Sequence, residues 1–281
     1  MHHLLLLHHL TELANGRTDR LMVLMPPGSA KSTYASLLLP AWWLMRFPGH
    51  SIIAASHTQG LATHFGRAVR RLVRDNSETL GYGLARDDQA AHRFRTDAGG
   101  EYFAAGLDGE ITGRRADPVL IDDPIKSHAE ADSATQRDAA WNWYRSELST
   151  RLKPRGRIIL IMTRWHTDDL GGRLLAADDD WRVLKLPALA EADDPLGRKP
   201  GEALWPVGKG ARRWSASAPR WGRGCGVRCI SRRRCPRAGH CFVLGGSMLV
   251  RRHLQVCAWC GPGTWPRLPP GKGATPTRPW G

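Results

Sequence analysis

The chain has 281 residues and a formal net charge of +15, which allows one large or two small domains and favours a nucleic-acid partner. No stretch reaches the ~18 apolar residues of a membrane span, and the start lacks a secretory signal, which excludes a membrane protein and predicts a cytoplasmic one. The charge is confined to one part of the chain. Residues 207–281 hold 15 Lys and Arg, no Asp or Glu and all six cysteines, whereas the first 206 residues carry 26 basic and 26 acidic side chains.

The predicted elements of the first 206 residues alternate between helices and strands. Leucines at positions 4–7, 10 and 13 predict an amphipathic helix at the start. Apolar runs follow at 21–25, 51–56, 101–106, 118–123, 157–163 and 181–187, with helix-like segments between them at about 31–46, 59–75, 128–152 and 168–177. Continuous apolar runs are typical of strands buried on both faces, so the pattern predicts a mostly parallel α/β sheet flanked by helices.

The first predicted strand runs into "MPPGSAKSTYAS" (25–36), which resembles the phosphate-loop pattern G-x-x-x-x-G-K-[ST] with Met25 and Ala30 in place of the glycines. Backbone N–H groups at the start of the following helix would bind the phosphates of ATP, with Lys31 at the β- and γ-phosphates and the Ser32 hydroxyl on Mg²⁺. Ala30 is acceptable if that position needs no positive φ, with Gly28 as the one permissive position. The alternative is an ordinary strand–turn–helix junction. The residues predicted to bind the nucleotide are Pro27, Gly28, Ser29, Ala30, Lys31, Ser32 and Thr33.

Two carboxylates end the predicted strand "PVLIDD" (118–123). In P-loop ATPases the first such acid holds Mg²⁺ and the second polarises the attacking water, roles that fit Asp122 and Asp123. The alternative is an acidic turn at the end of a strand. The next apolar run ends in "MTRWH", where Thr163, followed by Arg164, is the candidate for sensing the γ-phosphate.

The loop "GEITGRRAD" (109–117) carries paired arginines just before the acidic strand. An arginine placed at a γ-phosphate accelerates hydrolysis strongly, and Arg114 is the first candidate and Arg115 the second. The alternative is a pair of solvated loop charges.

Four blocks in order, "MPPGSAKSTYAS", "GEITGRRADPVLIDDPIKS", "WNWYRSELSTRLKPRGRIILIMTRWHTDDLGGRLL" and "LPALAEADDPLGRKPGEALWP", resemble the large terminase subunit of tailed bacteriophages and prophages over residues 1–206. The family includes phosphate loops without the standard glycines. The resemblance implies an N-terminal P-loop motor, using ATP and Mg²⁺, that drives double-stranded DNA into the procapsid in the host cytoplasm. It also implies a homo-oligomeric ring on the portal protein, a small terminase subunit as partner, and a C-terminal nuclease. By position, the motif residues carried over are Lys31 and Ser32 in the phosphate loop, Asp122 as metal ligand, and Asp123, Thr163 and Arg114 as catalytic residues.

Residues 207–281 depart from the family. They contain no carboxylate, so a two-metal nuclease centre cannot be built from them, and their composition resembles GC-rich DNA translated in another frame. We therefore expect an ATPase domain at 1–206 and a disordered, frameshift-derived basic tail at 207–281 in a truncated chain. Alternatives for the tail are a zinc site using Cys225, Cys229, Cys257 and Cys260, or a non-specific nucleic-acid binder. Alternatives for the whole chain are another nucleic-acid-dependent P-loop ATPase, such as a helicase-like translocase, or a non-catalytic prophage remnant.

Overall fold

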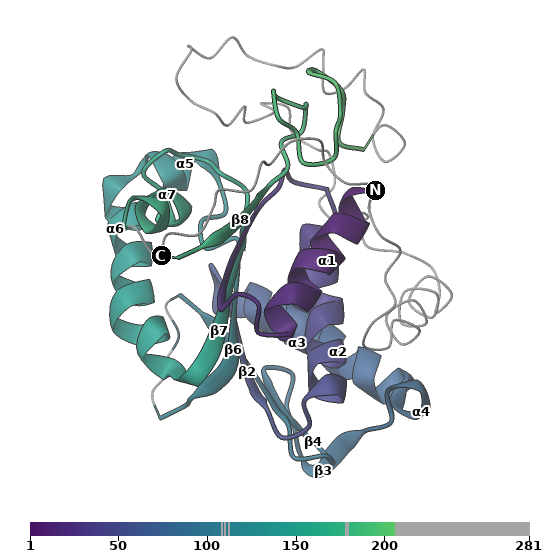
Figure 1. Ribbon diagram of the computed structural model, residues 1–281. Coiled ribbons are helices and arrows are strands. Elements are labelled where there is room, and N and C mark those ends of the chain that lie inside the picture. The colour runs from purple at the N-terminus through teal and green to yellow at the C-terminus, as the bar shows by residue number, and fades with distance from the viewer. Residues whose placement is uncertain (108, 110, 112, 178–179, 206–281) are drawn as a thin grey trace, which may run out of the picture. The chain divides into compact units, whose positions relative to one another are not determined.

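The computed structural model describes residues 1–107, 109, 111, 113–177 and 180–205. Within them, an eight-stranded sheet lies between two layers of helices (Figure 1). The strands are β1 (Arg20–Leu24), β2 (Ser51–Ser56), β3 (Leu84–Gln89), β4 (Arg93–Thr96), β5 (Glu101–Gly106), β6 (Ala116–Asp122), β7 (Leu152–Met162) and β8 (Arg182–Lys185). The predicted tail, with its cysteines and its predicted disorder, lies outside the described residues.

The strand order is β3-β4-β5-β2-β6-β7-β1-β8. From β5 to β8 each neighbouring pair is parallel, while β3 and β4 form an antiparallel extension at one edge. The predicted mostly parallel α/β fold is thereby confirmed. It follows from this order that β6, β7 and β1 lie side by side, with their carboxyl ends at the same edge of the sheet.

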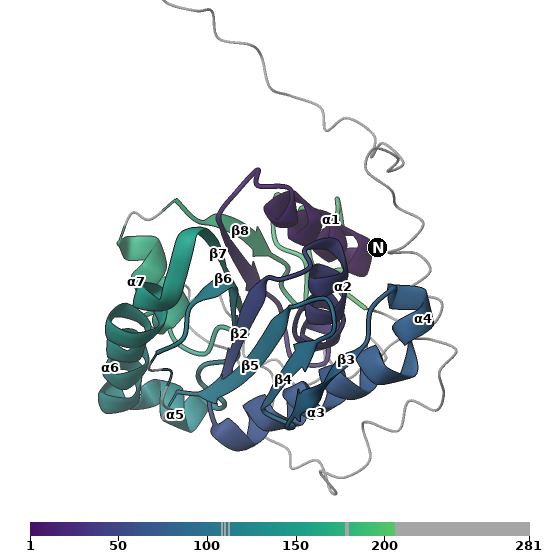
Figure 2. The same cartoon turned by 90° about the horizontal axis from the view of Figure 1, so that it is seen from below.

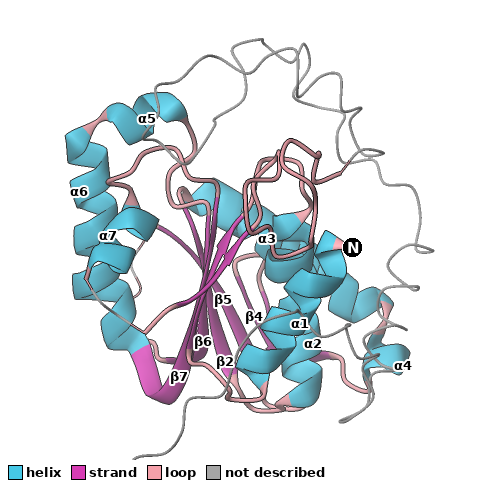
Figure 3. Ribbon diagram, turned by 45° about the horizontal axis from the view of Figure 1, so that its top comes forward, coloured by secondary structure: helices cyan, strands magenta, loops and turns pink. Residues whose placement is uncertain are grey.

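Helices cover both faces of the sheet. Figures 1 and 3 show α1, α2 and α3 on one side and α5, α6 and α7 on the other. Their bounds are α1 (His2–Ala14), α2 (Leu39–Arg46), α3 (Gln59–Asp75), α4 (Ser77–Leu80), α5 (His128–Asp132), α6 (Ala134–Asn142) and α7 (Leu170–Ala176). None of the helices in the described part of the chain is long and apolar enough to cross a membrane.

The core lies where the central strands meet these two layers. Val119 and Ile121 of β6 and Ile158 and Leu160 of β7 are at most 1% exposed. Apolar side chains on both faces of these strands are buried because helices cover both faces, which explains why the runs are continuous rather than alternating.

The edge hairpin formed by β3 and β4 escaped the sequence analysis. Its strand β3 reads "LARDDQ", and its residues are exposed or partly exposed, so no apolar run marks it. Charged residues are typical of edge strands, where they discourage pairing with other chains. Figure 2 shows the two strands beside β5, next to α3.

Two predicted helices are also divided. The segment predicted at 128–152 becomes α5, α6, a π-helical turn (Trp143–Leu148) and a short 3₁₀ turn (Ser149–Arg151). Ser133 interrupts it, because its backbone is extended and its hydroxyl accepts a hydrogen bond from the Gln136 N–H as the cap of α6. The segment predicted at 31–46 is a π-helical turn (Thr33–Leu38) followed by α2, with Pro40 in the first turn of α2.

Candidate active site

The candidate site lies at the carboxyl edge of the sheet, where β1, β6 and β7 end next to one another. The chain leaves β1 through residues 25–30 and becomes helical from Lys31. Strand β6 ends at Asp122 and β7 at Met162, one residue before Thr163. The parallel topology therefore brings together the three predicted segments that are most distant in sequence.

The loop between β1 and the helix has two residues with positive φ, Gly28 at 75° and Ala30 at 62°. The expectation that Ala30 needs no positive φ, with Gly28 as the one permissive position, is wrong. The loop turns twice in the left-handed region, and an alanine there costs roughly 1–2 kcal/mol. Its shape is held from within, because the Ser29 hydroxyl donates to the Pro26 carbonyl (2.7 Å). Pro27 and Gly28, by contrast, are exposed at the tip.

Asp123 joins the loop helix to the end of β7. Its Oδ2 lies 2.9 Å from Lys31 Nζ, and its Oδ1 accepts a hydrogen bond from the Thr163 N–H (2.8 Å). The residue has a φ of 43°, and its own N–H donates to the Ile161 carbonyl (2.8 Å), which turns the side chain toward β7. The Thr163 hydroxyl in turn donates to the Met25 carbonyl at 3.2 Å.

Asp122 points to the other side, into the start of the helix. It is 2% exposed and accepts hydrogen bonds from the hydroxyls of Ser32 (3.1 Å) and Ser36 (2.6 Å). Burial raises the pKa of the Asp122 carboxyl and the nearby Asp123 carboxylate raises it further, whereas Lys31 and the two hydroxyls act against this shift. Ser36 was missed in the sequence, although it lies four residues after Ser32 and hence on the same helix face.

The donor set at Asp122 suits a magnesium ion. Mg²⁺ prefers oxygen ligands and is typically held by one or two protein groups, with phosphates and waters completing its shell. The Ser32 hydroxyl and the Asp122 carboxylate are such oxygens, and they already touch. Among the described residues no group of three or more His, Cys, Asp or Glu gathers to form a separate metal site.

The family model described as terminase large subunit, T4likevirus-type, N-terminal, matches residues 22–218. The chain belongs to the terminase large-subunit family. The match includes the loop at 25–33, the paired aspartates and Thr163. Large terminase subunits are ATPases of the P-loop kind, so an enzyme of that kind is the coarse assignment for this chain.

Solved large terminases of similar fold come from a thermophilic bacteriophage (14% identity, TM-score 0.44) and from bacteriophage HK97 (14% identity, TM-score 0.43). The aligned parts cover 69% and 66% of this chain but 47% and 39% of those two terminases. This chain therefore spans less than half the length of these solved terminases. No curated protein matches it.

Arg114, the predicted arginine finger of this terminase, lies apart from the other site residues. Its guanidinium donates to Glu101 Oε1 (2.8 Å) and sits 4.1 Å from the centroid of the Phe103 ring. Glu101 begins β5, and Arg114 comes two residues before β6, so this contact lies at the amino edge of the sheet. The seven residues of β6 separate that edge from Asp122 by roughly 20 Å. Arg114 therefore does not face the phosphate loop of its own chain, and Arg115 beside it is exposed.

Replacing Arg114 with alanine is expected to affect stability rather than catalysis in the monomeric chain. Losing the ion pair with Glu101 and the stacking on Phe103 should lower the free energy of unfolding by about 1 kcal/mol. Urea denaturation and steady-state ATP hydrolysis would check this, with Arg114→Lys as a control that keeps the charge without the flat guanidinium. A hundredfold loss of kcat in a stable, monomeric variant would contradict this placement.

Proposed function

We propose that the described part of the chain is the ATP-hydrolysing motor domain of a phage large terminase, which drives double-stranded DNA into the procapsid. The observation that supports this most is the position of Asp123 between Lys31 and Thr163. One carboxylate contacts both the lysine that would bind phosphate and the strand end that would sense it. A surface lysine next to an ordinary turn would not be buried and paired in this way, and Lys31 is 5% exposed.

In the proposed mechanism, the N–H groups at the start of the loop helix bind the phosphates of ATP, aided by the helix dipole. Lys31 moves its ammonium group from Asp123 toward the β- and γ-phosphates. Bound Mg²⁺, held at Ser32 and Asp122, would neutralise phosphate charge. The electrostatic preorganisation of these groups is expected to contribute most of the rate.

The movement of Lys31 frees Asp123 Oδ2 for the attacking water. Asp123 orients this water and accepts its proton as the water oxygen bonds to the γ-phosphorus and the bond to ADP breaks. Because Asp123 Oδ1 is bonded to the Thr163 N–H, any shift of the carboxylate during this exchange is felt at the end of β7. Thr163 is thus proposed as the residue that couples hydrolysis to movement.

The family suggests the remaining partners, which we include in the proposal. They are double-stranded DNA, the portal protein, a small terminase subunit and further copies of this chain in a ring. Residues 207–281 are proposed as a basic, frameshift-derived tail after an ATPase domain at 1–206, in place of the nuclease. The absence of Asp and Glu after Glu202 supports this, since those residues cannot supply carboxylates to a nuclease centre.

Phosphate release by the full chain, with and without linear double-stranded DNA, tests the proposed substrate. We expect severalfold faster hydrolysis with duplex DNA, reduced by added salt because the contacts are to phosphates. Stimulation by single-stranded DNA alone would favour a helicase-like ATPase instead. Hydrolysis in neither condition would favour a non-catalytic remnant.

A further inference from the structure

Two chain segments leave the site side by side. From β6 the chain continues past Asp123 into α5 and α6, and from β7 it continues through Thr163 and residues 164–169 into α7. At their origin the segments are joined by the hydrogen bond from the Thr163 N–H to Asp123 Oδ1. The distance between these two residues is therefore set wherever the two segments are held together.

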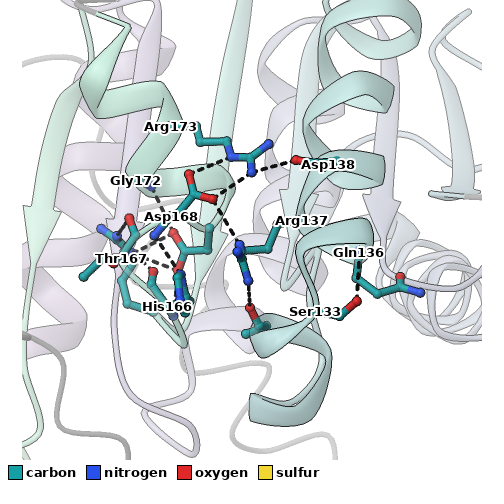
Figure 4. A network of polar contacts seen from close by, with 12 residues as sticks. Ser133, Gln136, Arg137, Asp138, His166, Thr167, Asp168, Gly172 and Arg173 are labelled. Atoms are coloured by element: carbon teal, nitrogen blue, oxygen red, sulfur yellow. Dashed lines mark hydrogen bonds and ion pairs between the residues drawn. The ribbon is translucent and has the colours of Figure 1, made fainter.

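A second junction lies farther out, between α6 and the loop before α7 (Figure 4). Asp168 accepts from Arg137 Nε at 3.1 Å and from Arg173 Nε and Nη2 at 2.8 and 2.7 Å. Arg173 also reaches Asp138 on α6 (2.8 Å), and Arg137 Nη1 donates to the Ala131 carbonyl in α5 (2.6 Å). Hydrogen bonds from Arg173 and then from Arg137 lower the pKa of Asp168 to about 2, so this carboxylate is charged at neutral pH.

The loop between the two junctions is stiff. Asp169 is 0% exposed and accepts from Arg164 Nε and from the Gly172 N–H, both at 2.9 Å. The Asp168 N–H donates to His166 Nδ1 at 2.9 Å. A Cβ at Gly172 would lie 1.8 Å from the Thr167 carbonyl oxygen, so the loop and α7 pack without space between them. A displacement at Asp168 is thus transmitted to Thr163 rather than absorbed on the way.

We infer that Arg137 and Asp168 are positioning residues for hydrolysis: their contact holds the segment after β7 against α6 and thereby fixes Thr163 against Asp123. The inference rests on the proposed function, in which Asp123 orients the attacking water. Arg137 is suited to this role because its side chain is 12% exposed and contacts α5 and the loop at once. Neither residue touches the phosphate loop in the described contacts, so their loss should act on the chemical step and not on nucleotide binding.

Two measurements on the full chain test the inference, using Arg137→Met, Asp168→Asn and the double variant. Arg137→Met keeps the apolar part of the side chain and removes its hydrogen bonds. We expect kcat to fall about tenfold in each single variant with KM within about twofold, since small misplacements of reacting groups cost at least this much. The double variant should be no slower than the slower single one, as two residues of one contact are not additive.

Amide hydrogen exchange gives a readout that does not depend on activity. In Arg137→Met the Thr163 amide should exchange about tenfold faster, while the amide of Val119 in the core of β6 keeps its rate. Lys185→Met, which breaks the exposed Lys185–Glu191 pair (2.7 Å) on β8, should change neither readout. Unchanged exchange at Thr163, or unchanged kcat in an active chain, would overturn the inference. If the wild type does not hydrolyse ATP, the proposed function fails, while faster exchange at Thr163 still supports the link.

Discussion

Replacing Lys31 with alanine is expected to lower kcat/KM for ATP hydrolysis by a factor on the order of 10²–10³, the loss typical of one preorganised group at developing charge. The buried ammonium is the only group that contacts Asp123 Oδ2 among the described ion pairs, and it is the group placed to reach the phosphates. The fold should persist, because Asp123 is 28% exposed and keeps its hydrogen bond from Thr163. Phosphate release over a range of ATP concentrations measures this loss.

The chain offers a matched control for this variant. Lys153 forms a similar ion pair with Asp117 (2.8 Å), at the amino ends of β7 and β6 and therefore far from the loop. Lys153→Ala should remove a comparable ion pair and leave kcat/KM unchanged. Equal rates for wild type and Lys31→Ala would show that Lys31 is not part of a nucleotide site.

Replacing Asp123 with asparagine is expected to separate binding from hydrolysis. The amide oxygen can still accept from the Thr163 N–H, but the side chain can no longer take a proton from water or pair with Lys31. We expect kcat to fall by a factor on the order of 10²–10⁴, the contribution of a general base. The affinity for ATP should be kept or increased, because Lys31 no longer leaves an ion pair to reach the phosphates.

Calorimetric titration with ATP and single-turnover hydrolysis measure the two effects separately. Asp123→Glu is the matched control, since it keeps the charge with one more methylene and should remain measurably active. If Asp123→Asn keeps kcat within twofold of the wild type, another residue orients the water. Weaker ATP binding in Asp123→Asn would contradict the proposed exchange of Lys31 between carboxylate and phosphate.

Most of the site could be predicted because each residue follows a buried strand. Lys31, Asp122 and Thr163 come just after or at the ends of apolar runs, and parallel strands place their carboxyl ends at one edge. The contacts of Asp123 with Lys31 and Thr163 required the strand order, which puts β7 between β6 and β1. The sequence alone does not contain that order, since β7 follows β6 and β1 precedes both.

Arg114 and Ala30 show where sequence reasoning failed, for different reasons. The loop before β6 begins at the carboxyl end of β5 and returns to the amino edge, and only its path in space shows which arginine lies at which edge. Ala30 was judged by residue type, but the backbone of the turn demands a positive φ there whatever the residue.

Phosphate release from saturating ATP and Mg²⁺, measured side by side for the wild-type chain and Asp123→Asn, tests the central claim most directly. The account predicts turnover by the wild type and its loss, by a factor on the order of 10²–10⁴, in a variant that still binds ATP. Equal phosphate release from both chains would contradict the claim that Asp123, between Lys31 and Thr163, is the centre of an ATP-hydrolysing site.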